Sequence, residues 1–331
     1  MTGLLNSQNG LNIHANEDGR KGFRLSSLSS EASIFVILVL IFILFSVVDP
    51  RFSSTSNMEN IMLQLPFLVI LSIGQSFPIV SRGFDLSVGS QMSVVSVVCA
   101  LFTLQYGLFL GLIGGMVTGG ILGAINGFMI TKTRISPLIA TVGMSSFAAG
   151  LALIITGGMP VQNMSDTFPL LGAGFLLHLP ISFYITVLVI IVTYIVLQRT
   201  VFGRHLYATG GNEEAARLSG INVDMIKFLA YVICGVLAGL SAVVLSSRVD
   251  SGIPTLGADY TLQSIAAAVI GGVSLEGGSG TILGASFGAL LLTVINNGLD
   301  LMNISSYVEM MVIGAIIVLA VYLDSLRKRS A

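Results

Sequence analysis

Neutral hydrogen-bonding side chains lie inside otherwise apolar segments of this sequence. Such amides and hydroxyls offer both donors and acceptors to the hydroxyl groups of an uncharged solute, and they need no counter-ion. The same groups also hydrogen-bond membrane helices to one another, so each single residue has a structural alternative. With one carboxylate added, the candidates for a solute path are Gln64, Gln75, Ser76, Asp85, Asn126, Gln263, Asn296 and Asn297.

Motifs for catalysis do not occur in the sequence. The chain has no G-x-x-x-x-G-K-[ST] nucleotide-binding loop, no H-E-x-x-H pair and no cysteine pair with metal-ligand spacing. Its formal net charge of −1 gives no argument for a nucleic-acid partner. We therefore expect no catalytic residue, no metal site and no cofactor bound by this chain, and hence no enzyme.

Two polar, glycine-rich insertions interrupt the apolar runs, at residues 81–90 and 271–280. Each carries one carboxylate among glycines and serines, Asp85 in the first and Glu276 in the second. Arg82 stands three residues before Asp85, and a local ion pair would spare the cost of a lone charge close to lipid. A shared spacing, G-x-x-L-x-x-G-S, is a weak sign of an internal repeat, and simple packing of helix ends is the alternative.

The longest charge-bearing run, residues 203–227, contains a short predicted helix at 213–219. Asn212 is a good N-cap residue, because its side-chain oxygen can accept a backbone N–H of the first turn. Gly220 stands where the helix end needs a positive φ. About two turns with small side chains, flanked by charge, suit a knob that docks on a soluble protein, although an ordinary connecting loop is the alternative. The candidate docking residues are Gly211, Asn212, Glu213, Glu214, Ala215, Ala216, Arg217, Leu218, Gly220 and Ile221.

The rest of the chain predicts an all-α, polytopic membrane protein. Hydrophobic residues make up 54% of the 331 residues and charged residues only 9%, whereas a soluble domain carries about a quarter charged residues. The apolar runs are too long for barrel strands, so the spans should be helices, and the 38 glycines favour their close packing. About ten spans, including short or broken ones, can be drawn at 34–48, 61–80, 87–104, 108–130, 137–155, 181–197, 228–245, 262–273, 282–299 and 307–323.

Charge orients these spans. With ten crossings and both termini in the cytoplasm, thirteen of the fifteen Lys and Arg residues fall inside and only Arg51 and Arg248 outside, as the positive-inside rule requires. The segment 262–273 fits either a full span or a re-entrant helix. The expected parts are a cytoplasmic tail, a transmembrane domain with a long cytoplasmic loop, and a basic tail, at residues 1–33, 34–325 with 203–227, and 326–331.

Two longer connections lie on the outer side, at residues 156–180 and 248–261. Their turn residues and mixed charge suit a landing surface for an extracytoplasmic partner, although plain solvated loops have a similar composition. Glu309, near the start of the last span, is expected to face the mouth of the path. The charged residues expected to contact such a partner are Arg51, Asp166, Arg248, Asp250 and Asp259.

Several motifs resemble those of a known family, the permease subunits of bacterial ABC importers for monosaccharides, and its ribose-permease type most of all. The sequence GFDLSVGS at residues 83–90 is similar to the family's GIDLSVGS, and the run YATGGNEEAARLSGINV occupies residues 207–223. Further matches are IAAAVIGG at 265–272 and NNGL at 296–299. The resemblance extends over most of the chain, from about residue 35 to 325.

The resemblance implies a multi-pass permease of the bacterial inner membrane that works as a homo- or heterodimer. Two cytoplasmic ABC ATPase subunits, which would hold the ATP and Mg, are expected to dock on the coupling helix around Glu214, Ala215 and Ala216. A periplasmic sugar-binding protein is expected to deliver the solute, a ribose-like monosaccharide or a related polyol. The lipid bilayer is the remaining partner.

The sequence also departs from the family pattern. Gln75-Ser76 stands where the family usually has a methionine-threonine pair, Pro78 replaces an aliphatic residue, and Arg82 often corresponds to glycine. If these positions line the path, the solute or the gating differs from that of ribose. Two alternative functions stay open at this point: a stand-alone facilitator or secondary carrier, and an ABC permease for a nucleoside or a signalling molecule.

Overall fold

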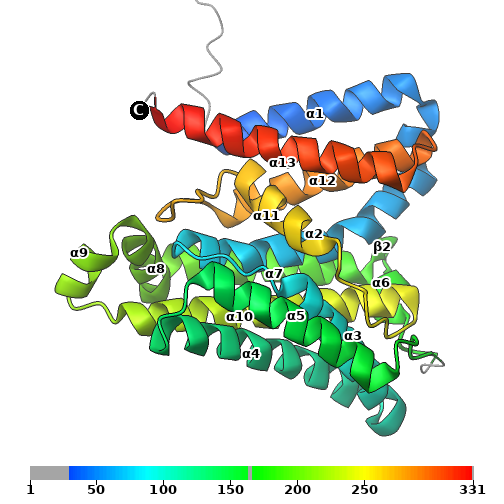
Figure 1. The fold of residues 1–331 in the computed structure, drawn as a ribbon. Coiled ribbons are helices and arrows are strands. Elements are labelled where there is room, and N and C mark those ends of the chain that lie inside the picture. Colours follow the sequence, from blue (N-terminus) through cyan, green and yellow to red (C-terminus); the bar gives the residue numbers. More distant parts are fainter. Residues whose placement is uncertain (1–29, 163–165, 330–331) are drawn as a thin grey trace, which may run out of the picture.

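The structure, a computed structural model, describes residues 30–162 and 166–329, so nearly all of the expected N-terminal tail lies outside the described residues. Within that part the chain is almost entirely helical, with one short hairpin of two strands (Figure 1). Its elements are α1 (Ser30–Val48), the 3₁₀ helix η2 (Pro50–Ser53), α2 (Thr55–Val80), α3 (Val88–Tyr106), α4 (Leu108–Lys132), α5 (Pro137–Thr156), α6 (Leu170–Ala173), β1 (Phe175–Leu176), β2 (Leu179–Pro180), α7 (Ile181–Arg199), α8 (Val201–Gly211), α9 (Glu213–Leu218), α10 (Val223–Val249), α11 (Tyr260–Ile270), α12 (Ile282–Leu301) and α13 (Ser306–Arg329).

Each of the ten predicted apolar segments corresponds to one of these helices. Among the described residues, eight helices are long and apolar enough to cross a bilayer, namely α1, α2, α3, α4, α5, α7, α10 and α12. The apolar stretches of α11 and α13 are shorter, Tyr260–Ile270 and Tyr307–Ile316. The prediction of an all-α, polytopic membrane protein is therefore confirmed.

Some predicted boundaries move. The first helix begins at Ser30, four residues before the expected span, and α13 continues to Arg329 through most of the expected basic tail. The region 203–227 is not a plain loop with one short helix, because α8 occupies its first third. The segment 262–273 forms the 11-residue helix α11, which rises only about 16 Å and so is too short to span about 30 Å of hydrocarbon on its own.

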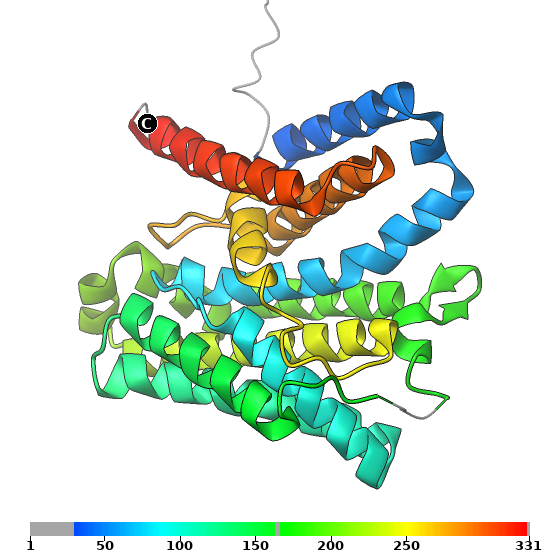
Figure 2. The ribbon, with the colours of Figure 1, turned by 45° about the vertical axis from the view of Figure 1, so that its right-hand side comes forward.

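Helices α2 and α11 lie in the middle of the bundle. In both views α1, α12 and α13 lie on one side of them, and α3, α4, α5 and α10 lie on the other (Figures 1 and 2). Every residue of α2 from 66 to 80 is buried. The central position suits this stretch, because its polar side chains Ser72, Gln75 and Ser76 find hydrogen-bond acceptors in the protein there, away from lipid.

Close packing of helices α4 and α10 confirms the expectation from the glycine content. A Cβ atom built on Gly119 would lie 2.3 Å from the carbonyl oxygen of Gly235, which is far inside the contact distance that real side chains allow. The two backbones therefore touch directly. Small residues permit this approach between membrane helices, where dispersion contacts rather than the hydrophobic effect hold the pair together.

The bundle has two distinct ends. One end, here called the α9 end, holds α8, α9, the end of α2 and the loop 271–281; a hydrogen bond from Gly278 N to Val80 O joins the last two. The opposite end holds α6 and the hairpin of β1 and β2, in which Phe175 pairs with Pro180 (Figure 1). Helix α10 runs from one end to the other, since α9 precedes its start and α6 packs against it near Arg248.

Candidate functional site

The short helix α9 forms as its sequence signals predict. The side chain of Asn212 caps it by accepting a hydrogen bond from Ala215 N at 3.0 Å. At the other end Gly220 has φ +84°, a conformation that glycine adopts without strain. The next residue donates from Ile221 N to Ala216 O, which closes the last turn. Both predicted ends are confirmed, with Ser219 as the C-cap residue.

The exposed face of α9 differs from the predicted one at one residue. Leu218 is 85% exposed and Ala215 is also exposed, but Ala216 is only 4% exposed. The prediction that Ala216 presents itself to a partner is therefore wrong, because its methyl group faces the protein itself. Within α9 the exposed residues are Glu214, Ala215, Arg217 and Leu218, and Leu218 is the one large apolar side chain among them.

Ion pairs hold α9 against the start of α10. Lys227 bonds to Glu213 at 2.5 Å, and Arg217 bonds to Asp224 at 2.8 Å and to Glu213 at 3.4 Å. Partial burial by itself would raise the pKa of Glu213, but the bonds from Lys227 and Arg217 outweigh it, and the net pKa lies below its ordinary value. These contacts fix the direction in which α9 points, although exposed pairs contribute little to overall stability.

Asp85 lies in a buried network of hydrogen bonds. Its carboxylate is fully buried and accepts hydrogen bonds from Ser87 N at 2.9 Å, from Gln91 Nε2 at 3.0 Å and from Asn126 Nδ2 at 3.1 Å. The expected ion pair with Arg82 is wrong, because the Arg82 guanidinium bonds to backbone oxygens of other segments. Charge-assisted hydrogen bonds from several donors satisfy the carboxylate instead.

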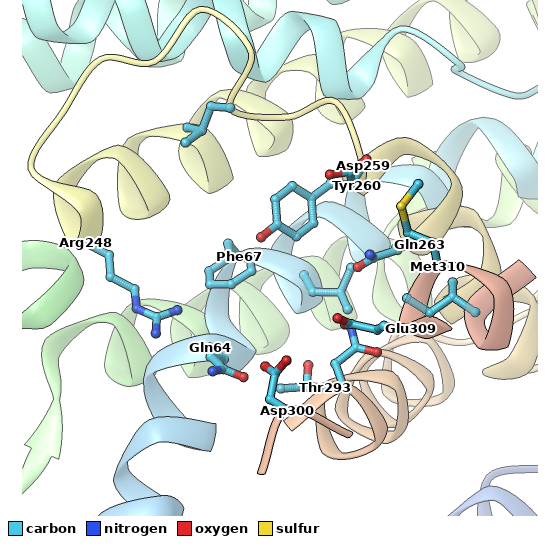
Figure 3. A pocket seen from close by; sticks show the side chains of 14 residues that line it. Gln64, Phe67, Arg248, Asp259, Tyr260, Gln263, Thr293, Asp300, Glu309 and Met310 are labelled. Carbon is cyan, nitrogen blue, oxygen red and sulfur yellow. The ribbon is translucent and has the colours of Figure 1, made fainter. Parts of the chain in front are cut away.

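A polar cavity of about 420 Å³ opens between α2, α10, α11, α12 and α13 (Figure 3). Its charged and polar side chains come from the ends of these helices away from α9, and aromatic rings lie among them. Arg248 stands over the ring of Phe67, with 5.8 Å between the guanidinium carbon and the ring centroid. The lining residues are Gln64, Phe67, Leu68, Arg248, Leu256, Asp259, Tyr260, Gln263, Thr293, Asn296, Asp300, Glu309, Met310 and Ile313.

The cavity contains some of the predicted path residues and excludes others. Gln64, Gln263, Asn296 and Glu309 line it. The remaining candidates are buried between helices and do not line this cavity. Asn297 exchanges two hydrogen bonds with Asn57, at 2.8 and 3.0 Å. Those outside the cavity are Gln75, Ser76, Asp85, Asn126 and Asn297.

Of the residues predicted for binding-protein docking, some line the cavity and others lie outside it. Arg248 and Asp259 line the cavity. Arg51 bonds to Asp49 at 2.6 Å and to the carbonyl oxygen of Leu301, so it ties η2 to the end of α12. Asp166 and Asp250 are exposed, and Asp250 ends α10 with φ +48°.

Sequence reasoning missed several cavity residues. Asp300 closes the apolar run of α12, and a carboxylate at that position is a usable signal of a polar mouth. Phe67 and Tyr260 carried no signal, because an aromatic residue in an apolar helix is the ordinary case. Their rings meet edge to face at 5.3 Å, and this contact brings α2 and α11 together at the cavity.

A second cavity, of about 340 Å³, is unsuited to a hydroxylated solute. It lies between α1, α2, α7 and α12, and its lining includes Leu38, Phe42, Met58 and Phe183. Every lining residue is apolar, so a sugar hydroxyl would lose its hydrogen bonds to water there without replacement. The polar cavity is therefore the candidate solute site.

Comparison with known proteins finds relatives along nearly the whole chain. The model of a family described as "Branched-chain amino acid transport system / permease component" matches residues 57–321. The ribose import permease protein RbsC of Escherichia coli strain K12 is 37% identical over 93% of this chain and 97% of its own length. No solved structure matches the chain significantly.

Two further relatives from the same organism are named for other sugars. The L-arabinose transport system permease protein AraH is 34% identical over 94% of this chain and 95% of its own length. The D-allose transport system permease protein AlsC is 34% identical over 93% of this chain and 95% of its own length. The similarity covers both the cavity and α9.

Proposed function

Since the chain belongs to the family of branched-chain amino acid transport system permease components, we propose that it is the membrane subunit of a binding-protein-dependent ABC importer for a monosaccharide. The relatives named for ribose, L-arabinose and D-allose support a sugar as the solute class. A ribose-like sugar or a related polyol fits this support. The chain supplies the translocation path, and the chemistry of ATP hydrolysis belongs to partner subunits.

The observation that carries the proposal is the polar cavity at the end of the bundle away from α9. Its amides and carboxylates offer acceptors and donors to hydroxyl groups, and Phe67 and Tyr260 offer aromatic surfaces to a sugar ring. Its volume of about 420 Å³ lies in the range of small-molecule sites. Such a lining suits a monosaccharide, whereas a purely hydrophobic solute would leave its polar groups unpaired.

Helix α9 is proposed as the coupling helix on which a cytoplasmic ABC ATPase docks. It is exposed, capped at both ends and fixed by ion pairs to α10. The distance along α10 from Lys227 to Arg248 is 21 residues, or about 31 Å, so the docking surface and the cavity are separated by the thickness of a bilayer. ATP and Mg would be bound in the partner, which drives the permease by rigid-body movement.

The proposed orientation follows from charge. Basic residues gather at the α9 end, which the positive-inside rule assigns to the cytoplasm together with both termini. The cavity then opens toward the periplasm, where a sugar-binding protein would deliver its solute. Exposed Asp166 and Asp250, with Arg248 and Asp259 at the cavity, are the proposed contacts for that protein. A second permease copy, identical or not, would complete the path.

Reconstitution tests the proposal. The permease is placed in proteoliposomes with its ATPase and binding protein, which are identified by co-purification, and uptake of labelled ribose, arabinose and allose is measured with and without ATP. We expect uptake of at least one of these sugars that requires both ATP and the binding protein. Uptake that needs neither would identify a stand-alone facilitator, and ATP-driven uptake of a nucleoside in place of any sugar would refute the proposed solute class.

A further inference from the structure

The last turn of α8, directly before α9, touches two segments that are distant in sequence. A Cβ atom on Gly210 would lie 1.7 Å from the carbonyl oxygen of Val80 at the end of α2, and 2.5 Å from the backbone nitrogen of Gly278. Gly278 N in turn donates to Val80 O at 2.8 Å. The ends of α8 and α2 and the loop 271–281 therefore meet backbone to backbone.

Arg82 joins these three segments through its side chain. Its Nη2 donates to Gly211 O at 2.7 Å, and its Nε donates to Glu276 O at 2.8 Å. Gly211 is the last residue of α8, where the helix dipole leaves partial negative charge on the carbonyl groups. The planar guanidinium holds both acceptors in one fixed geometry, which a lysine cannot reproduce.

The backbone at Arg82 shows that this arrangement is not an ordinary turn. Arg82 has φ +63°, a conformation that is uncommon for residues with a Cβ and that costs nothing for glycine. Glycine, which the resembling family often has at this position, would fit the backbone and lack the two hydrogen bonds. The arginine therefore combines a less favoured backbone conformation with side-chain hydrogen bonds to α8 and to the loop 271–281.

Two helices lead from this junction to the polar cavity. Helix α2 ends at the junction with Val80 and lines the cavity with Gln64 and Phe67. Helix α11 ends just before the loop 271–281 and lines the cavity with Tyr260. The two helices connect the junction with the cavity over about 20–24 Å of α2, from Val80 to Phe67 and Gln64, and about 15 Å of α11, from Ile270 to Tyr260.

We propose that Arg82 is the positioning residue that transmits the movement of α9 to α2 and α11, and thereby to the solute cavity. The inference rests on the proposed function, because it needs a partner that moves α9. Arg82 does not line the solute cavity, and its one contact with the proposed docking residues is the hydrogen bond to the backbone oxygen of Gly211. It acts by keeping the end of α8, the end of α2 and the loop 271–281 moving as one body.

The test compares Arg82→Gly with Arg134→Gly in the reconstituted, ATPase-bound transporter. Arg134 controls for the loss of an exposed arginine near α9, since it also has positive φ (+56°) and lies in the connection between α4 and α5, close enough to act on Asp224 but outside the Arg82 junction. The quantity measured is sugar transported per ATP hydrolysed. We expect Arg82→Gly to lower this ratio by roughly 2- to 30-fold, the range of coupling mutations, and Arg134→Gly to leave it unchanged.

A third variant and a second measurement keep the outcome decisive. Arg82→Lys retains the positive charge but lacks the planar guanidinium group that bonds to two acceptors. Its ratio of sugar transported to ATP hydrolysed should therefore lie between those of the wild type and Arg82→Gly. If Arg82→Gly does not fold, Arg82→Lys takes its place in the test. Binding of the ATPase to Arg82→Gly should equal that of the wild type, since α9 is unchanged. An unaltered transport-to-ATP ratio in the Arg82 variants, or an equal loss in Arg134→Gly, overturns the inference. Absence of ATP-driven uptake by the wild type instead refutes the proposed function.

Discussion

Leu218 gives the sharpest test of the docking surface. Its exposed fraction of 85% is the largest of any large apolar side chain among the described residues, and it lies on a short polar helix where lipid does not cover it. Complete burial of such a side chain in a partner groove contributes about 2 kcal/mol. Leu218→Ala should therefore weaken ATPase binding by about 2 kcal/mol, or roughly 30-fold in Kd. Leucine and alanine are both good helix formers, so α9 itself should persist.

The assay titrates the detergent-solubilised permease with its purified ATPase partner and follows binding by fluorescence anisotropy. Leu177→Ala is the matched control, because Leu177 is 81% exposed and lies in the β1–β2 turn at the opposite end of the bundle. It should leave the Kd unchanged.

Two results would refute the reasoning about Leu218. An unchanged Kd for Leu218→Ala would mean that the partner does not bury this side chain, so α9 would not be the docking knob. An equal loss for Leu177→Ala would mean that the effect comes from general surface changes and not from α9. Circular dichroism and the melting temperature of each variant check that the fold is kept.

Three further predictions test the packing, the cavity and the ion pairs. Gly210→Ala should destabilise the protein by about 1–3 kcal/mol or more, because the new Cβ atom would lie 1.7 Å from the carbonyl oxygen of Val80 in α2. Gly211→Ala is the control, since a Cβ atom on Gly211 meets open space. The melting temperatures of the two variants in detergent should therefore differ. Gln263→Ala should raise the KM for sugar uptake about 2- to 10-fold, because one hydrogen bond to the sugar, of about 0.5–1.5 kcal/mol, is lost. Gln105→Ala should leave the KM unchanged, because Gln105 lies near the end of α3, outside the cavity. Because the folded-state pKa of Glu213 lies below its ordinary 4.5, its ion pairs should be complete above pH 4.5 and should weaken only as the pH falls through the lowered value. The mobility of a spin label on α9 measures this, and a mobility that already rises above pH 4.5 would contradict it.

The resemblance and the local signals were accurate where the relevant interactions lie close together in sequence. The cap of α9 joins Asn212 to Ala215, and Gly220 ends the helix by its own backbone conformation. The membrane spans follow from composition alone, because a bilayer requires long apolar helices whatever packs around them. These features could be read before any tertiary contact was known.

Side-chain roles that depend on distant partners could not be read in the same way. Asp85 is bonded to Asn126, 41 residues away, and Arg82 to Glu276, 194 residues away. A local ion pair between Arg82 and Asp85 is the simplest hypothesis from the sequence, but in the folded protein each of these two side chains hydrogen-bonds to a distant segment instead. The prediction that Ala216 is exposed is wrong for a related reason. Ala215 and Ala216 are equivalent in the sequence, and only the packing of the folded chain buries one of them.

The sequence by itself determined that this is a multi-pass helical membrane protein with a capped helix at 213–219, one residue longer than the observed Glu213–Leu218. Only the tertiary structure decided which amides face the cavity, because Gln263 and Gln75 have the same chemistry and equally apolar surroundings in the chain. Gln263 lines the cavity, while Gln75 is fully buried and donates to Asp85 O. The physical reason is that the direction of a side chain on a helix follows from local geometry, whereas what it meets there depends on how all the helices pack.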